Sequence, residues 1–193
     1  MIKDISRLLM VETYTPECDL DEKAHDFELK SVDGNFYSLN DLVGKKATLI
    51  MFICNHCPYV QSILEQLVVE ASVLEKKGVN CIAINSNDVD RYPEDSFENM
   101  QKISKKFGFS FPYLLDETQS TAREYQAVCT PDFFGYNSSL ELLYRGRFDD
   151  RKASKKMSAN SSEMFKGMIE IARTNKSPIN QLPSVGCSIK WKV

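Results

Sequence analysis

Hydrophobic and polar positions along the chain alternate between short apolar runs and helical patterns. Residues Ala47–Ile53 are apolar apart from one threonine, which is typical of a strand buried on both faces of a parallel sheet. Apolar residues then recur at helical spacing over residues 60–74, with Pro58 in the predicted first turn and Gly78 as the predicted C-cap. Val79–Ile84 is the next apolar run. This order predicts a strand, a helix and a second parallel strand.

The remaining pattern predicts an antiparallel start and a helical end. Asp33-Gly34 is a turn signal between the predicted strands Phe27–Leu29 and Phe36–Leu39, which together form a hairpin. The later elements expected along the chain are a helix over 97–107 ended by Gly108, a strand at Phe111–Leu115, a short helix at Thr118–Tyr125, strands at Phe133–Tyr136 and Leu142–Arg147, and a last helix carrying Met164, Met168, Ile169 and Ala172. Asn160 and Glu163 are spaced as a capping box for that helix. The order predicts an α/β sandwich with a mixed central sheet.

Length and charge narrow the class of protein. With 193 residues, one domain is expected: a polar N-terminal extension at 1–24, a domain at 25–174, and a C-terminal tail at 175–193 packed on it. The net charge of −3 gives no basic field for a nucleic-acid partner. No apolar run approaches the roughly 20 residues that span a membrane. The first residues lack a sustained apolar stretch, so a cytoplasmic location is expected unless a signal peptide was removed.

Candidate chemistry is concentrated in the segment Cys54-Asn55-His56-Cys57-Pro58, which follows the predicted buried strand and begins the predicted helix. The unpaired N–H groups and partial positive charge at a helix N-terminus favour a thiolate over a thiol. Two intervening residues let one sulfur attack a mixed disulfide formed by the other. Because Cys54 precedes the helix and Cys57 lies in its first turn, this geometry predicts Cys54 as the more exposed nucleophile and Cys57 as the resolving thiol.

Metal binding is the alternative from another functional class. The chain has six cysteines, but no second pair at this spacing and no paired histidines complete the four ligands that structural zinc requires. Two thiolates with the His56 imidazole suit Cu(I), so a Cu(I)-binding metallochaperone is kept as an alternative. The primary expectation is redox chemistry with no metal and no cofactor, because the disulfide itself is the redox centre.

Three motifs carry a resemblance to a known group: Cys54–Val60, Cys129-Thr130-Pro131-Asp132 and Gly186–Trp191. They resemble the redoxin branch of the thioredoxin superfamily, within a peroxiredoxin-like and TlpA-like group of thiol–disulfide oxidoreductases. The resemblance implies a thioredoxin-like fold with an N-terminal hairpin, an extra βα unit and a cis-proline loop facing the cysteine pair. In that loop Pro131 would shape a peptide-binding groove, and Thr130 would offer backbone hydrogen bonds to a partner. The partners implied are a disulfide- or thiol-containing protein or small molecule and an unidentified reductant.

The sequence departs from the family pattern at positions that matter for catalysis. No acid stands in Ala47–Ile53 to take a proton from Cys57, where thioredoxin keeps a buried carboxylate. A peroxiredoxin needs Thr or Ser three residues and Pro seven residues before its reactive cysteine, and Met51 and Ala47 hold those places before Cys54. A thiol peroxidase is therefore the alternative enzyme. His56 resembles the histidine of strongly oxidising periplasmic relatives, and is expected to stabilise the Cys54 thiolate and raise the reduction potential.

The other cysteines have less defined roles. Cys129 precedes Thr130 and should approach the pair, and Cys187 lies in the tail motif. Both are candidate auxiliary redox residues, with core packing as the alternative for each. Cys81, in a predicted buried strand, is expected to be an inert core residue. Cys18 is not assigned a role.

Overall fold

The computed structural model describes residues 12–15, 20, 22–151 and 160–193. Cys18 and the first part of the predicted extension lie outside the described residues. None of the helices in the described ranges is long and apolar enough to cross a membrane.

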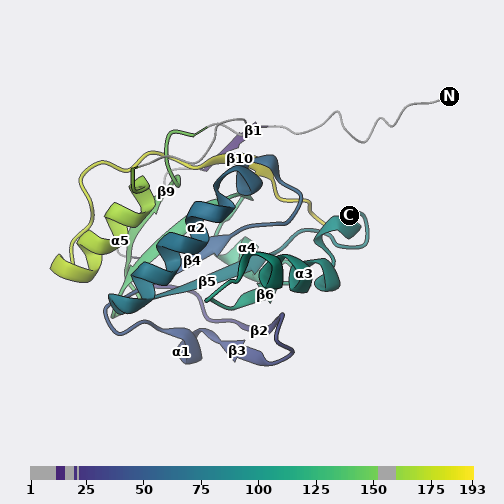
Figure 1. Ribbon diagram of the computed structural model, residues 1–193, viewed down its shortest axis with the longest axis horizontal. Coiled ribbons are helices and arrows are strands. Elements are labelled where there is room, and N and C mark those ends of the chain that lie inside the picture. The colour runs from purple at the N-terminus through teal and green to yellow at the C-terminus, as the bar shows by residue number, and fades with distance from the viewer. Residues whose placement is uncertain (1–11, 16–19, 21, 152–159) are drawn as a thin grey trace.

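A mixed sheet of seven strands forms the centre of the molecule (Figure 1). In chain order the strands are β2 (Glu28–Ser31), β3 (Phe36–Ser38), β4 (Ala47–Phe52), β5 (Val79–Asn85), β6 (Tyr113–Leu115), β8 (Asp132–Asn137) and β9 (Leu142–Gly146). Their order across the sheet is β3-β2-β6-β5-β4-β8-β9. The β4–β5 and β5–β6 pairs are parallel, and the other pairs are antiparallel. The predicted mixed sheet is confirmed.

Helices cover both faces of this sheet. Their bounds are α1 (Leu39–Leu42), α2 (Pro58–Lys76), α3 (Phe97–Phe107), α4 (Ser120–Glu124) and α5 (Glu163–Thr174), with a 3₁₀ turn η2 (Pro93–Asp95). Buried side chains of α2, α3 and α5 share one core cluster, while those of α1 and α4 share the other. Figure 1 shows α2 and α5 in front of the sheet, with α1 at its lower edge.

The central strand β4 contributes to both cores, which explains its nearly continuous apolar sequence. Leu49, Met51 and Ile53 point into the cluster under α2 and α5, and Ile50 and Phe52 point into the opposite cluster. Every residue of β4 is buried. Successive side chains of a strand alternate between its faces, so a strand covered on both sides has no polar face. The rigid, doubly buried strand fixes the position of the residues that follow it.

The predicted capping box of the last helix is wrong. Ser162, and not Asn160, is the N-cap of α5, and its Oγ accepts from the backbone N–H of Phe165 at 2.9 Å. The buried Glu70 carboxylate of α2 accepts from Ser162 N at 2.9 Å and Oγ at 2.6 Å. This contact from another helix, which no local pattern encodes, sets where α5 begins.

The N-terminal hairpin ends earlier than its sequence predicts. Leu39, expected as a strand residue, is the first residue of the short helix α1. Ser38 and Asp41 cap this helix reciprocally, since Asp41 N donates to Ser38 Oγ and Ser38 N donates to the Asp41 carboxylate. Leu39 is buried, so the turn of helix carries an apolar side chain into the core.

A second, three-stranded sheet brings both ends of the chain together. Its strands are β1 (Glu12–Tyr14), β7 (Cys129–Thr130) and β10 (Val185–Ser188), in the order β1-β10-β7. All pairs are antiparallel, and Figure 1 shows β10 beside β1 at the top of the molecule. These strands have two to four residues, too few for a periodic signal. The predicted tail therefore contributes a strand between the N-terminal extension and the predicted proline loop.

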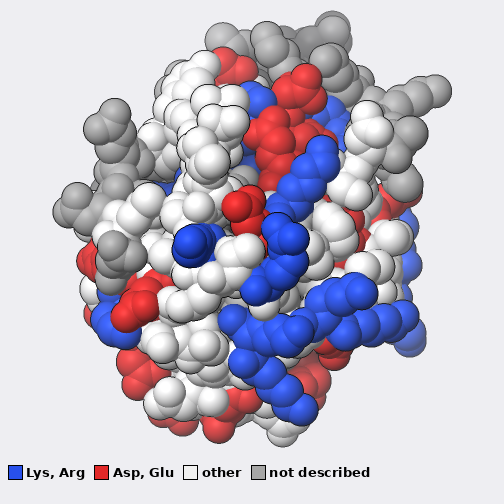
Figure 2. All heavy atoms as spheres, turned by 90° about the vertical axis from the view of Figure 1, so that its left-hand side faces the viewer, with Lys and Arg blue, Asp and Glu red and all other residues white. Residues whose placement is uncertain are grey.

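The surface carries both signs of charge. Figure 2 shows a band of lysine and arginine side chains across the middle and lower part of one side, with acidic side chains above and below it. This distribution is consistent with the small net charge of −3.

Candidate redox site

The cysteine pair lies where strand β4 ends and helix α2 begins. Ile53 N donates to Ile84 O at 3.0 Å, which extends the ladder of β4 by one residue and holds Cys54 at the end of the sheet. Pro58 occupies the first turn of α2, as predicted, while Cys57 is the N-cap, one position before the turn in which it was expected. Cys54 is 2% exposed and Cys57 is fully buried. The pair therefore combines a helix N-terminus with near-complete burial.

The predicted proline loop faces both sulfurs. The Thr130–Pro131 peptide bond is cis, as the resemblance implies. Cys54 Sγ lies 3.2 Å from Thr130 Oγ1, and Cys57 Sγ lies 3.2 Å from Thr130 O. Residues separated by more than 70 positions in the chain are thus brought into contact at one site.

Asp95 is a buried carboxylate of this site that sequence reasoning missed. It is fully buried in η2 and accepts hydrogen bonds from Asn55 N at 2.7 Å, His56 N at 3.3 Å and Asn87 Nδ2 at 2.7 Å. A carboxylate that accepts several bonds fixes the backbone that supplies them. Asp95 therefore holds the turn between the two cysteines. The sequence shows only a polar loop there, and nothing local links it to the pair, because helix α2 and strand β5 lie between them in the chain.

His56 is directed at Asp95. Its Nδ1 lies 2.7 Å from Asp95 Oδ2, and its ring stacks on Tyr92 with centroids 5.6 Å apart. The hydrogen bond with Asp95 raises the pKa of His56 above its ordinary value, against the opposing effect of burial. Asp95 therefore favours the protonated form of His56.

The two sulfurs differ in acidity in the direction opposite to the prediction. Burial, followed by contact with Cys57 and the charge of Asp95, raises the pKa of the Cys54 thiol. Burial also disfavours the Cys57 thiolate, but hydrogen bonds from Cys187, Cys54 and the backbone of α2 outweigh it and lower the pKa of Cys57. The prediction that His56 stabilises a Cys54 thiolate is wrong for this arrangement. The buried Asp95 acts on Cys54, and the helix N-terminus acts on Cys57.

Of the two candidate auxiliary cysteines, one contacts the pair. Cys187 Sγ lies 3.0 Å from Cys57 Sγ. Cys129 Sγ lies 3.9 Å from Pro131 O instead, and burial raises its pKa. The structure therefore brings Cys187 to the reactive sulfurs and leaves Cys129 as a packed residue of the proline loop.

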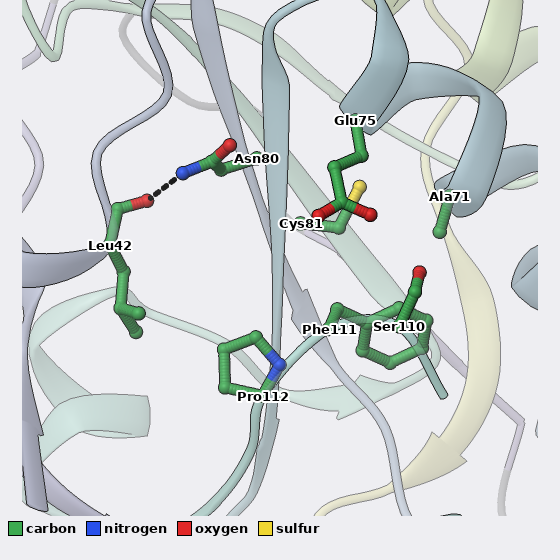
Figure 3. A pocket seen from close by; sticks show the side chains of 8 residues that line it. All are labelled: Leu42, Ala71, Glu75, Asn80, Cys81, Ser110, Phe111 and Pro112. Carbon is green, nitrogen blue, oxygen red and sulfur yellow. Dashed lines mark hydrogen bonds between the residues drawn. The ribbon is translucent and has the colours of Figure 1, made fainter. Parts of the chain in front are cut away.

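Cys81 lies near the other end of the sheet. It is paired with Leu49 in the β4–β5 ladder, three positions before the end at Phe52, and burial raises its pKa. Figure 3 shows its sulfur beside the Glu75 carboxylate in a cavity of about 100 Å³, whose lining contains no second sulfur. The expectation that Cys81 is a core residue agrees with this placement.

A larger hollow borders the proline loop. Its volume is about 270 Å³, and Pro131, Tyr59 and Ile63 line it from the loop and from α2. Charged side chains also line it: Glu12, Arg147, Asp149, Asp150 and Arg151. The Tyr59 hydroxyl donates to Glu12. The arrangement offers apolar contact and both signs of charge next to Pro131.

One group of described side chains has the geometry to hold a metal ion. Donor atoms of Cys54, His56 and Asp95 all lie within 4.8 Å of one another. This group has one sulfur, whereas the Cu(I) alternative requires both Cys54 and Cys57 with His56. Cu(I) prefers soft thiolate ligands, so the mixed sulfur, nitrogen and oxygen set does not match it.

Solved structures of similar proteins have the same fold. An uncharacterised conserved protein from Geobacillus kaustophilus is 43% identical, with a TM-score of 0.90 over 96% of this chain and 98% of that one. A hypothetical protein from Sinorhizobium meliloti is 36% identical, with a TM-score of 0.88 over 94% and 99%. The thioredoxin domain of a thiol-disulfide oxidoreductase from Bacteroides vulgatus is 17% identical, with a TM-score of 0.56 over 67% and 89%. The last likeness establishes the thioredoxin-like fold.

Family membership follows from the sequence match. No curated protein matches the chain. The AhpC/TSA family matches residues 20–148, a stretch that contains the cysteine pair, the buried Asp95 and the cis-proline loop. The site described above therefore lies within the matched region, apart from Cys187. This chain is a member of the AhpC/TSA family with a thioredoxin-like fold.

Proposed function

We propose that this protein is a thiol–disulfide oxidoreductase whose redox centre is a Cys54–Cys57 disulfide. The observation that carries the proposal is the place of Cys57, which is the N-cap of a 19-residue helix beside the cis-proline loop. Its pKa is lowered although it is fully buried. A low-pKa thiol is a good leaving group in disulfide exchange, and this is the property that such a redox centre uses.

The acidity order supports transfer of the disulfide to a substrate. A substrate thiolate would attack Cys54 Sγ, the Cys54–Cys57 bond would break, and Cys57 would leave as the stabilised thiolate. A second substrate thiol then attacks the mixed disulfide, which releases Cys54 as a thiol and the substrate as a disulfide. The substrate loses two electrons and the enzyme disulfide gains them. Stabilisation of the reduced form makes the disulfide more oxidising.

The substrates proposed are proteins or small molecules that carry thiols or disulfides. The hollow lined by Pro131 and Tyr59 supports a partner that makes apolar contact beside the cis-proline loop. A separate redox partner is required to restore the starting state after each turnover. A cytoplasmic location also stays a proposal, to be tested by localising the tagged protein in cells.

The test is a redox titration in glutathione buffers, with thiols alkylated and peptides mapped by mass. Cys54 and Cys57 share the tryptic peptide 47–76, so their disulfide closes a loop inside that peptide, which is then lighter by two hydrogen atoms. The proposal expects a reversible two-electron transition in that peptide. Cys57→Ser should trap a mixed disulfide at Cys54, because no neighbouring thiol of the pair resolves it. The proposal is contradicted if Cys54 and Cys57 stay reduced in every buffer. It is also contradicted if Cys54→Ser traps as much mixed disulfide as Cys57→Ser.

A thiol peroxidase is the second candidate, and membership of a family within the redoxin branch favours it. Against it, Met51 and Ala47 stand where a peroxide-activating Thr or Ser and a Pro are needed, and both are buried core residues. Oxidation of Cys54 by hydrogen peroxide should therefore be slow compared with a dedicated peroxidase. Stopped-flow rates equal to those of a peroxiredoxin measured alongside would reverse the order of the two candidates.

A further inference from the structure

Strand β10 places a third cysteine against the proposed redox centre. Its register with β7 sets Cys187 opposite Thr130, the residue before the cis-proline. On its other side β10 pairs with β1, where Cys187 is opposite Glu12. The resemblance assigns the Thr130 backbone to a partner peptide, and here the chain's own tail pairs with it. Cys187 is thus held by a ladder on each side.

The approach of β10 to the proline loop depends on a glycine. A Cβ atom at Gly186 would lie 2.0 Å from Thr130 O and 3.1 Å from Pro131 N. Only a residue without a side chain lets the two backbones come this close. The close approach carries the sulfur of the next residue, Cys187, into the same buried cluster as Cys54 and Cys57.

The sulfur geometry matches a pair ready for exchange. Cys187 Sγ is 3.0 Å from Cys57 Sγ, and a disulfide bond is about 2.05 Å long. Closure by about 1 Å would have to come from the side chains of Cys187, in the four-residue strand β10, and Cys57, the N-cap of α2. Cys57 therefore has two sulfur neighbours, one from its own turn and one from the tail.

We propose that Cys187 is a third redox-active cysteine, which exchanges with the Cys54–Cys57 disulfide to form a Cys57–Cys187 disulfide and release Cys54. The Cys187 thiolate attacks Cys57 Sγ, the Cys57–Cys187 bond forms as the Cys54–Cys57 bond breaks, and the proton lost by Cys187 is taken up by Cys54. One disulfide and one thiol stand on each side of the step, so no outside oxidant is needed. This inference rests on the proposed function, which supplies the starting disulfide.

Oxidation of the pair removes the main obstacle to this attack. In the reduced protein the hydrogen bond with the Cys57 thiolate, followed by burial, raises the pKa of Cys187, while Lys190 opposes the shift. Once Cys57 is part of a disulfide it carries no negative charge. The negative charge of Cys57 then no longer raises the pKa of Cys187, while the positive charge of Lys190 still lowers it. Cys187 therefore ionises more readily in the oxidised protein.

Cys129 provides a matched comparison for Cys187. It lies on β7, the strand that pairs with β10, and it is equally buried. Its sulfur donates to Pro131 O at 3.9 Å, and among the described residues it makes no hydrogen bond to another sulfur. Cys129 and Cys187 are thus two buried cysteines of one small sheet, and only Cys187 has the contact with the Cys57 sulfur that the proposal requires.

The experiment is mass mapping of the disulfides in the full chain across glutathione buffers. Cys187 lies in the tryptic peptide 177–190 and Cys129 in 124–145. A Cys57–Cys187 bond therefore links peptide 47–76 to 177–190, whereas a Cys54–Cys57 bond stays inside 47–76. The linked pair is expected in the wild type and in Cys129→Ser. It should be the main oxidised form in Cys54→Ser and absent in Cys187→Ser.

The outcomes separate this inference from the proposed function. The inference is overturned if the wild type shows the Cys54–Cys57 disulfide within peptide 47–76 and neither the wild type nor Cys54→Ser shows the linked peptides. The proposed function then still stands. A linked pair without any internal loop overturns the proposed function. Linkage of 124–145 in place of 177–190 shows that Cys129 is the third cysteine, and also overturns the inference. Because peptide 47–76 contains both Cys54 and Cys57, fragment masses of the linked wild-type peptides locate the bond even if a variant fails to fold, and a bond at Cys54 overturns the inference.

Discussion

The two ends of the β4–β5 strand pair each bury a cysteine, and their chemistry differs. Near the amino end, Cys81 sits beside the small cavity of Figure 3, where burial raises its pKa and the Glu75 charge adds to the shift. At the carboxyl end, Cys57 is as deeply buried, yet its pKa is lowered. Burial disfavours a thiolate at both places. The difference lies in hydrogen bonds: those from Cys187, Cys54 and the backbone lower the pKa of Cys57, whereas none among the described residues lowers the pKa of Cys81.

The comparison shows that depth in the core does not make a cysteine inert. A helix N-terminus supplies backbone N–H groups and a partial positive charge. The neighbouring Cys54 and Cys187 thiols add two further donors. Parallel strands β4 and β5 both end at this side of the sheet, so the connections after them, including the loop with Asp95, meet here. Ligand and active sites of parallel sheets gather at the carboxyl ends of the strands for the same reason.

The largest expected effect is a difference in catalytic activity between variants at the two ends of the β4–β5 strand pair. Cys57→Ala should reduce catalysed disulfide exchange to the rate without protein, because the leaving thiolate is lost. Cys81→Ala should keep the rate, with a loss of about 1 kcal/mol in the free energy of unfolding from the small cavity. The measurement is turnover of a model dithiol, with urea unfolding of both variants. Equal activity losses in the two variants would remove the distinction between the ends.

The second test titrates the thiolates. Ultraviolet thiolate absorbance should show one thiolate forming well below the ordinary cysteine pKa of about 8.5, and Cys57→Ala should abolish it. Cys187→Ala should move this transition up by about one to two pKa units, because a hydrogen bond to a charged group is worth about 1.5–3 kcal/mol. Cys81→Ala should leave it in place. If Cys54→Ala and not Cys57→Ala removes the transition, the acidity order derived from the structure is reversed.

The third test loosens the contact between the tail and the proline loop. Gly186→Ala puts a Cβ atom 2.0 Å from Thr130 O, so β7 and β10 must separate. Forced insertion of a methyl group into a packed place costs about 1–3 kcal/mol, which urea unfolding would detect. The low thiolate pKa of Cys57 should also rise, as Cys187 moves away. An unchanged stability and an unchanged titration would show that the close approach is not maintained in solution.

The smallest effect concerns His56 and is dependent on pH. The folded pKa of His56 is raised by Asp95, so its contribution to stability is present below its unfolded pKa of about 6.5 and is lost as the pH rises through the folded value. His56→Ala should cost about 1 kcal/mol at acidic pH and less at alkaline pH. Urea unfolding at several pH values measures the difference. A cost that grows with pH contradicts the ion pair.

Coupling to Asp95 sharpens this last test. If the two side chains act as a pair, the double variant His56→Ala with Asp95→Asn should be less destabilised than the sum of the single variants. The Asp95→Asn variant should also raise the rate at which the turn between the cysteines exchanges its amide hydrogens, because Asn55 N and His56 N lose a charged acceptor.

Much of the fold was predictable because its signals are local. The apolar run of Ala47–Ile53, the Pro58 start of α2 and the left-handed Gly108 at the end of α3 all appear in the structure. The Asn160 cap failed because Glu70, from a different helix, selects Ser162. Strands β1, β7 and β10 were not predicted because, with two to four residues each, they repeat the two-residue strand period at most twice.

The sequence by itself determined that a cysteine pair follows a doubly buried strand at a helix N-terminus, because spacing, apolar periodicity and proline placement are properties of the chain. The tertiary structure alone decided which sulfur is acidic and which third cysteine joins the pair. Acidity depends on groups such as Asp95 and Cys187 that lie 38 and 130 positions from Cys57. Electrostatic and hydrogen-bond energies fall off over a few ångströms, and only folding sets distances on that scale between such distant residues.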